Sequence, residues 1–342
     1  MPAPGKNAAR SLWPWAALCT LLISRAPAQK LNWTEPSLIG VPYARCCAPS
    51  VYDTAMGATL LYGGANYSIN PATIFEGTWE FSKTTGWKQL APPVSPPPLE
   101  GPGMAYDPTT GTAVLFGGYL GNYVTSNETW TWDGVTWTQQ FPPVSPPPRT
   151  WNTSGMVFDS LVGKVVMFGG WNYTGVFSFM NDTWEWDGTS KTWTEKFPAH
   201  SPSPRAAALA YDEATRRVLL FGGLTSQSTF TGDTWTYDGV DWAEQEPTTT
   251  PPARCDNALA FNPNLHAVVM FGGLAGPCED CGEGRLNDTW LWGGRNWTQV
   301  QTPTSPGPSS GTSFDYDATV NDMLLFGGFV GSYSYTNAAW LF

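Results

Sequence analysis

The stretch Ala113-Val-Leu-Phe-Gly-Gly118 decides the fold, because its pattern returns six times along a chain of 342 residues. Each copy ends on an aromatic residue and two glycines, and a Thr-Trp or Ala-Trp pair follows 11 to 16 residues later. The doublets end at Gly64, Gly118, Gly170, Gly223, Gly273 and Gly328, at spacings of 54, 52, 53, 50 and 55 residues. A period of about 50 residues is typical of a repeat architecture, in which every unit builds the same small sheet.

Aligned on the glycines, each repeat reads as four short strands, here called a, b, c and d. Strand a ends in an aromatic residue and Asp or Asn, as in Met104-Ala-Tyr-Asp107, and strand b ends on the glycine doublet. Strand c carries Trp-x-aromatic, and strand d begins at a further Trp. Alternation with period two, broken by turn residues, predicts strands. Asp-Gly pairs such as Asp133-Gly134 stand where a hairpin between c and d needs positive φ.

The aromatic residues of strand c predict how neighbouring sheets pack. The residue two beyond each strand-c Trp is aromatic in all six repeats, and a spacing of two puts both rings on one face of the strand. These residues are Phe81, Trp132, Trp186, Tyr237, Trp292 and Phe342. Proline-rich runs such as 142–148 follow strand d and cannot continue a hydrogen-bonded ladder. We therefore expect stacked sheets joined by stiff linkers.

The two ends of the repeat array complement each other. The chain ends at Trp340-Leu-Phe342, inside the sixth strand c, and no strand d follows. Leu31-Asn-Trp33-Thr34 matches the strand-d pattern of Trp137-Thr138. We therefore expect the N-terminal segment to supply the outer strand of the last sheet and to close a ring, which covers an otherwise open edge.

The first 28 residues read as a targeting segment. Lys6 and Arg10 precede an apolar stretch over 12–23, and Ala26-Pro27-Ala28 follows as a small-residue cleavage site. This pattern predicts a secretory signal peptide and a secreted, extracellular or periplasmic protein. No other stretch approaches the length of a transmembrane span, so we expect no membrane insertion.

The charge balance narrows the range of partners. Residues 1–28 hold three of the 17 basic residues and none of the 28 acidic ones, so the remainder carries a net charge of −14. Such a surface repels phosphate backbones and anionic membranes, which excludes nucleic acid as a partner. The apolar content of 42% is ample for a packed core, and the charged fraction is only 13%.

Beyond the targeting segment five cysteines remain: Cys46, Cys47, Cys255, Cys278 and Cys281. In an oxidising compartment an odd number leaves one free thiol or one intermolecular bond. We expect a disulfide among Cys255, Cys278 and Cys281, in which Cys255 pairs with either of the other two or they pair with each other. Cys278-Glu-Asp-Cys281 lacks a second Cys/His pair at metal-binding spacing, so no metal site is expected.

With these features in place, the chain resembles the kelch repeat: an Arg before strand a, the glycine doublet ending strand b, an aromatic in strand c and a Trp in strand d. The resemblance covers essentially all of 31–342. It implies an all-β, six-bladed β-propeller over 29–342, with blades at about 45–91, 99–141, 149–198, 205–246, 254–301 and 309–342 joined by 31–34. It implies no single activity, because kelch propellers include oxidases, sugar epimerases and binding modules.

Two departures from the kelch pattern bear on function. The Arg before strand a is present as Arg45, Arg149, Arg205 and Arg254, but the second repeat has Leu99-Glu100 and the sixth has Ser309-Ser310. Kelch oxidases hold copper with two His and two Tyr, whereas His266 here lies in an a–b turn and His200 in a d–a linker. Those turns fall on opposite faces of the disc, so we expect no copper site and no other cofactor.

The b–c loops are the expected binding surface. They are long and variable, at 65–77, 119–128, 171–182, 224–233, 274–288 and 329–337, and they emerge on the same face as the d–a linkers. Variable loops on a rigid scaffold are the usual place for binding. Of 19 tryptophans only Trp151 and Trp171 lie outside the strand pattern and the targeting segment, and both fall in the third repeat. With Arg149 and Tyr173 they form the predicted subsite, for a sugar ring or a peptide side chain, or else they pack against the neighbouring blade.

Other candidate residues leave alternatives open. Arg45, Arg149, Arg205 and Arg254 either pair with a carboxylate-bearing ligand or bond the backbone of adjoining linkers. The acidic loop with Glu279, Asp280, Glu283 and Asp288 lacks the oxygen spacing of a calcium site and is expected to be solvated. Eight Asn-x-Ser/Thr sequons occur, at Asn32, Asn66, Asn127, Asn152, Asn172, Asn181, Asn287 and Asn296. Several of them are by-products of the repeat itself.

The sequence therefore predicts a secreted, monomeric, non-catalytic module that binds a protein or a glycan through its b–c loop face. The alternative is a sugar-modifying enzyme of the epimerase or lyase type, using Arg, Tyr and acidic residues at the channel mouth. No Ser-His-Asp, Cys-His or paired-carboxylate arrangement emerges from the spacing, so no catalytic residue is assigned.

Overall fold

The structure is a computed structural model that describes Met1 and residues 31–342, apart from 152–154, 227–228, 277–283 and 332. Residues 31–342 form one compact unit, and every regular element in its described part is a β-strand. The predicted signal peptide lies outside the described residues. Across the described chain, no helix has the length and apolarity that crossing a membrane requires.

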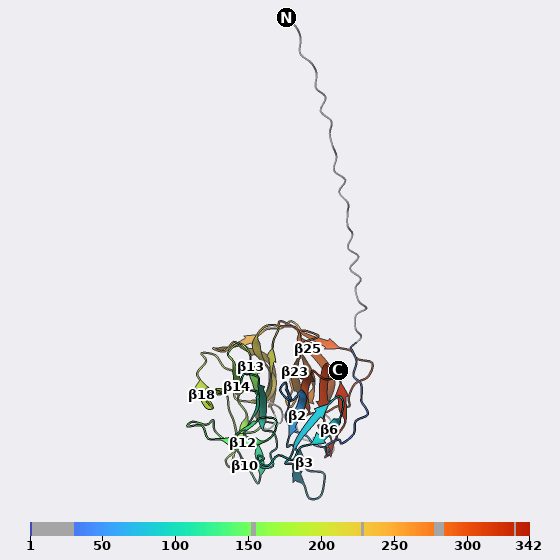
Figure 1. Cartoon of the computed structure of the whole chain (residues 1–342). Coiled ribbons are helices and arrows are strands. Elements are labelled where there is room, and N and C mark those ends of the chain that lie inside the picture. The colour runs from blue at the N-terminus through green and yellow to red at the C-terminus, as the bar shows by residue number, and fades with distance from the viewer. Residues whose placement is uncertain (2–30, 152–154, 227–228, 277–283, 332) are drawn as a thin grey trace. The chain divides into compact units, whose positions relative to one another are not determined.

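Six antiparallel sheets surround a common axis (Figure 1), which confirms the predicted six-bladed propeller. Blade 1 contains β1 (Ser50–Asp53), β2 (Ala58–Tyr62), β5 (Thr78–Ser82) and β6 (Gly86–Gln89). Blade 2 contains β7 (Gly103–Asp107), β8 (Thr112–Phe116), β11 (Thr129–Trp132) and β12 (Trp137–Gln140). Blade 3 contains β13 (Met156–Asp159), β14 (Lys164–Phe168), β17 (Thr183–Asp187) and β18 (Thr192–Lys196).

The remaining blades repeat this order of strands. Blade 4 contains β19 (Ala206–Asp212), β20 (Arg217–Ser226), β21 (Thr229–Tyr237) and β22 (Trp242–Gln245). Blade 5 contains β23 (Ala258–Asn262), β24 (Ala267–Leu274), β25 (Arg285–Trp292) and β26 (Trp297–Val300). Blade 6 contains β27 (Ser313–Asp317), β28 (Asp322–Phe326) and β31 (Ala339–Leu341).

The b–c loops are short hairpins of their own. In four blades they form β3 (Ala65–Asn66) with β4 (Thr73–Ile74), β9 (Tyr119–Gly121) with β10 (Val124–Thr125), β15 (Trp171–Tyr173) with β16 (Phe177–Phe179), and β29 (Phe329–Gly331) with β30 (Ser334–Tyr335). In blades 4 and 5 the described residues form no separate hairpin, because strands b and c are longer and continue to pair beyond the glycine doublet. Each hairpin is anchored by a bridge to the residue after the Arg position, such as Thr150 to Trp171.

The glycine doublet joins each blade to the next. In blade 2 the N–H of Gly118 donates to the carbonyl of Arg149 at 2.9 Å. A Cβ on Gly117 would lie 2.5 Å from that same oxygen, and both glycines have positive φ. Only glycine meets both demands. The contact recurs around the ring and ends with Gly328 donating to Arg45 at 2.8 Å.

The strand-d tryptophans fix the spacing between blades. Trp137 Nε1 donates to Thr78 Oγ1 of the preceding blade at 2.8 Å, and Trp193 bonds Thr129 in the same way at 2.9 Å. Six apolar clusters fill the spaces between successive sheets, and tryptophan is present in every one of them. The second ring of each predicted strand-c pair therefore lies in the core, whereas the first ring is half-buried in Trp79, Trp235 and Trp340.

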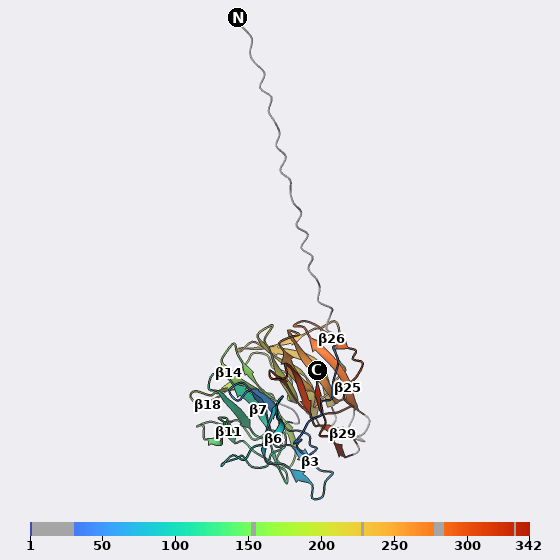
Figure 2. The same ribbon diagram turned by 45° about the vertical axis from the view of Figure 1, so that its right-hand side comes forward.

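The predicted closure of the ring is confirmed. Thr34 and Leu341 exchange two backbone hydrogen bonds of 2.9 Å, so the N-terminal segment lies beside the last strand c. Trp33 is fully buried, its ring centre lies 4.8 Å from that of Phe342, and its Nε1 donates to Thr289 Oγ1 at 2.9 Å. In Figure 1 the first blade, coloured blue, and the last, coloured red, are neighbours, and Figure 2 shows the same relationship.

Candidate functional site on the loop face of blades 2 and 3

A cavity of about 190 Å³ opens between the b–c hairpins of blades 2 and 3. Aromatic side chains form most of its wall: Tyr119 and Tyr123 from blade 2, and Trp171, Tyr173 and Phe177 from blade 3. Glu100 and Thr150, the residues that bridge to the start of each hairpin, complete it. The structure therefore brings Trp171 and Tyr173, two predicted site residues, into one cavity.

The rings of this cavity support one another. Tyr123 and Tyr173 lie 4.7 Å apart across the blade boundary, and Phe177 contacts Tyr173 at 5.1 Å and Trp171 at 5.3 Å. Ring pairs at these separations are mutually stabilising. Tyr123 is nevertheless 65% exposed and Phe177 is 40% exposed. The wall is thus both ordered by its own contacts and accessible to a ligand.

Glu100 supplies the charged group of the cavity. It accepts a hydrogen bond from the hydroxyl of Tyr67, a ring of the blade 1 hairpin. Burial raises the pKa of Glu100, although hydrogen bonds from Tyr67 and Cys47 oppose the shift. A carboxyl held among aromatic rings can accept hydrogen bonds from an amide, a hydroxyl or an ammonium group of a ligand.

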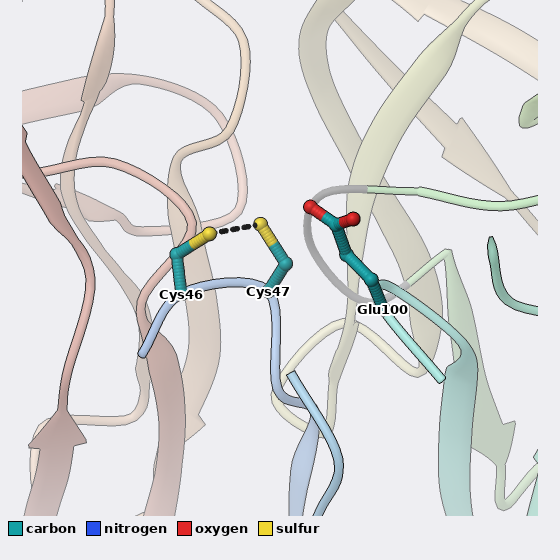
Figure 3. A group of neighbouring side chains, drawn as sticks. All are labelled: Cys46, Cys47 and Glu100. Atoms are coloured by element: carbon teal, nitrogen blue, oxygen red, sulfur yellow. Dashed lines mark hydrogen bonds between the residues drawn. The ribbon is translucent and has the colours of Figure 1, made fainter. Parts of the chain in front are cut away.

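Two buried thiols, those of Cys46 and Cys47, lie close to the Glu100 carboxyl. Cys46 and Cys47 are buried with their sulfur atoms 2.7 Å apart, and their sulfurs and a Glu100 oxygen all lie within 4.8 Å of one another. Figure 3 shows the two cysteines on one turn and Glu100 on a separate segment. The hydrogen bond to Cys46, together with burial, raises the pKa of Cys47 well above its usual value. Burial and this hydrogen bond therefore favour the neutral thiol of Cys47.

Of the two alternatives for Trp151, the structure supports packing against the neighbouring blade. It is 1% exposed, and its Nε1 donates to the carbonyl of Phe168 at 3.2 Å. The ring lies under the glycine doublet, where a Cβ on Gly170 would come within 2.9 Å of it. Trp151 is therefore part of the core beneath the site and presents no surface to a ligand.

The four arginines of the kelch pattern bond the protein itself. Arg149 is fully buried, donates to the carbonyl of Gly169 and forms two hydrogen bonds with Asp182, at 2.6 and 2.7 Å. Equivalent ion pairs join Arg205 with Asp233 and Arg254 with Asp288. Each of these aspartates also accepts the Nε1–H of the strand-c Trp two residues later.

Arg45 lacks such an aspartate. It is 2% exposed, donates to the carbonyls of Tyr43 and Gly63, and lies 4.2 Å from the centre of the Phe75 ring. Of the two alternatives for the arginines, the geometry supports bonds within the protein. All four side chains are buried, so none of them presents a guanidinium group to a carboxylate-bearing ligand.

The other predicted residues are spread over the molecule. Cys255 is buried, while Cys278, Cys281, Glu279, Asp280 and Glu283 lie outside the described residues. Among the sequons, Asn127, Asn181 and Asn287 are exposed, whereas Asn32, Asn172 and Asn296 are half-buried. Asn66 is buried and its amide donates to the carbonyl of Ala44 at 2.7 Å, so the fold does not present it for modification. Asn152 lies outside the described residues.

Sequence reasoning missed Glu100 as a site residue. It noted Leu99-Glu100 only as a departure from the Arg pattern. The available signal was Leu99, which replaces the Arg of the repeat. Glu100 follows it at the position that bridges to the b–c hairpin, which Cys46, Thr150 and Cys255 occupy in other blades.

Fold and site together define a kelch-type β-propeller with an aromatic cavity on its loop face. Residues 51–238 match the family described as the KLHDC2/KLHL20/DRC7 Kelch-repeats domain. The match spans more than half of the chain, which therefore belongs to this kelch-repeat family.

Two similar proteins extend the comparison. The chain is 31% identical over 195 residues to the dynein alpha chain of the flagellar outer arm of Chlamydomonas reinhardtii. The alignment covers 51% of this chain but only 4% of that dynein chain. Among solved structures, the structure of YjhT superposes with a TM-score of 0.66 at 14% identity, covering 89% of this chain and 96% of that one. At that identity the likeness shows the fold alone.

Proposed function

We propose that this protein is a secreted, non-catalytic binding module whose loop-face cavity holds a side chain of a protein ligand. Membership of the kelch family supports a role as a protein-binding module. The observation that carries the finer proposal is the cavity itself, with five aromatic side chains and the Glu100 carboxyl converging between two hairpins.

The chemistry of the cavity favours an apolar or aromatic side chain that also carries a hydrogen-bond donor. Rings such as Trp171 and Phe177 supply apolar contact area at low cost in conformational entropy. Glu100 is the acceptor that orients the bound group. Binding sites of this kind are mostly apolar, with a few placed polar groups.

Secretion rests on the N-terminal segment alone. The basic Lys6 and Arg10, the apolar stretch and the Ala26-Pro27-Ala28 site form the pattern of a signal peptide. Expression in a eukaryotic secretory host, followed by N-terminal sequencing of the protein in the medium, tests this part of the proposal. A mature chain beginning near residue 29 supports secretion, whereas retention of an uncleaved chain in the cell contradicts it.

A screen against extracellular proteins and a glycan array tests the binding proposal. For a protein that binds saturably, we expect Trp171→Ala and Tyr173→Ala each to cost about 2 kcal/mol of binding free energy, roughly thirtyfold in Kd. The matched control is Phe197→Ala, which removes an 84% exposed ring that does not line the cavity. This control is expected to leave Kd unchanged.

Other outcomes are equally informative. Equal loss of binding in Phe197→Ala, or unchanged binding in both cavity variants, contradicts the assignment of the cavity. Binding to glycans and to no protein would replace the protein ligand with a sugar. Turnover of a sugar would support the alternative, an epimerase- or lyase-type enzyme.

A further inference from the structure

A second, larger cavity opens at the opposite end of the propeller axis. Its volume is about 610 Å³, and the strands a form its wall. These strands are the innermost of each blade, because each contacts the strand a of the next blade and β27 contacts β1. The cavity is therefore the mouth of the central channel on the face of the a–b turns, away from the b–c hairpins.

The wall carries one aromatic ring from every blade. Each ring belongs to the residue before the Asp or Asn that ends strand a: Tyr52, Tyr106, Phe158, Tyr211, Phe261 and Tyr316. Five of the six rings are half-buried, so part of each lies at the surface of the mouth, whereas Tyr211 is 6% exposed and belongs to an interblade core cluster.

Hydrogen bonds hold three of these rings in place. The hydroxyl of Tyr106 accepts the N–H of Ala55 at 3.2 Å, and that of Tyr211 accepts the N–H of Leu161 at 3.1 Å. The hydroxyl of Tyr316 bonds Asn264 at 3.3 Å. In each case the partner is in the a–b turn of the preceding blade, so the rings are fixed before any ligand arrives.

Asp315 breaks the repeat inside this aromatic wall. The equivalent position is apolar in the other five blades, as Val51, Ala105, Val157, Ala210 and Ala260. The Asp315 carboxylate accepts the N–H of Tyr52 at 2.5 Å and that of Tyr316 at 2.8 Å. The other five blades form the same inner strand without a carboxyl at this position.

The charged side chains among the described residues that line the cavity are carboxylates. Glu213 adds a second carboxylate at the a–b turn of blade 4, and His266 stands in the turn of blade 5. Neither Lys nor Arg occurs among the described residues that line the cavity. A cavity with aromatic walls and acidic groups attracts positive charge, because ring faces and carboxylates both stabilise a cation.

We propose that this cavity binds a small organic cation, an ammonium group carried on an apolar or aromatic body, with Asp315 as its counter-charge. The volume is that of a small-molecule site. The five half-buried rings supply apolar contact for the body and aromatic surface for the ammonium group. The site is separate from the loop-face cavity and does not depend on the proposed function.

Binding should depend on pH through the groups that face the ligand. Burial raises the pKa of Asp315 to about 7, and the charge of Asp317 adds to the shift, although the N–H groups of Tyr52 and Tyr316 oppose it. Protonation of Asp315 removes the counter-charge, and Glu213 and His266 are the other acidic and basic side chains that line the cavity. Affinity should therefore fall as the pH is lowered from about 8 to about 5.

Isothermal titration of the full chain with benzyltrimethylammonium tests the proposal, with benzyl alcohol as the neutral comparison. We expect saturable binding of the cation and about tenfold weaker binding in Asp315→Ala, which installs the residue of blades 2, 4 and 5. Phe158→Leu removes a ring without a hydroxyl and should weaken binding severalfold. Glu195→Gln, an exposed acid outside the cavity, should change nothing.

Three results would overturn the proposal: no saturable binding of the cation, equal affinity for benzyl alcohol, or unchanged affinity in an Asp315→Ala variant that is folded. Trp171→Ala separates the two sites. It should leave binding of the cation unchanged, and loss of binding in that variant would place the probe in the loop-face cavity.

Discussion

The amide of Gly328 donates a 2.8 Å hydrogen bond to the carbonyl of Arg45 and so joins the last blade to the first. The same contact links Gly118 to Arg149 and recurs at the other blade boundaries. Because the preceding glycine packs against the same carbonyl, the doublet is a joint between blades and not merely a turn. Its recurrence explains why the glycines set the period of the sequence.

Gly327→Ala should destabilise the protein more than Gly111→Ala. The two glycines have nearly the same φ, +69° and +67°, but a Cβ at 327 would lie 2.6 Å from the Arg45 oxygen whereas none of the described atoms lies within 4 Å of one at 111. Both variants should lose about 1 kcal/mol to the left-handed backbone. Gly327→Ala should lose roughly 2 kcal/mol more to the clash. Equal midpoints in urea for the two variants would refute the role of the joint.

Ala339→Thr should stabilise the protein. The strand-d Trp of five blades donates to a strand-c Thr of the preceding blade, but the matching position for Trp87 is Ala339. Trp87 Nε1 is buried without an acceptor among the described residues. A new hydroxyl there should add about 1 kcal/mol. Thr78→Ala, which removes the equivalent acceptor of Trp137, should cost at least as much. Thermal unfolding of both variants measures these changes in stability.

Asp315→Ala should change how stability depends on pH. The pKa of Asp315 in the fold, about 7, lies above the ordinary 3.8, so the folded protein binds more protons than the unfolded chain between these values. The contribution of Asp315 to the stability of the wild type should therefore fall as the pH rises across this window. Asp315→Ala lacks that loss, so its Tm relative to that of the wild type should rise from pH 4 to pH 7. A constant difference would show that Asp315 is ionised throughout.

The sequence predicted the fold because each repeat carries its own signals. The glycine doublet, the paired rings of strand c and the strand-d Trp have the same structural role in every blade. The sequence therefore repeats the pattern of one blade six times, which makes the pattern easy to recognise. Even the closure by Trp33 was predictable, because a strand-d pattern stood at one end and was missing at the other.

The sites were only partly predictable. Trp171 was identified because it falls outside the repeat pattern, but the same argument selected Trp151, which the fold buries under Gly170. Position in the sequence alone does not show whether a ring near the end of a strand faces the loop surface, as Trp171 does, or is buried in the core, as Trp151 is. The cavity on the face of the a–b turns was missed, because each of its rings is part of the repeat pattern and alone suggests only a structural role. Only the arrangement around the axis brings Tyr52 and Tyr316 to one cavity with Asp315.

The unfolding free energy of Trp33→Ala tests the closed ring most directly. Trp33 is buried against Phe342, Phe271 and Phe314, so its removal should cost about 3–5 kcal/mol. Phe141→Ala, which removes an 82% exposed ring, is the control and should cost almost nothing. A loss of several kcal/mol in Trp33→Ala alone is the predicted result. Equal stability of the two variants would show that the N-terminal segment does not close the propeller.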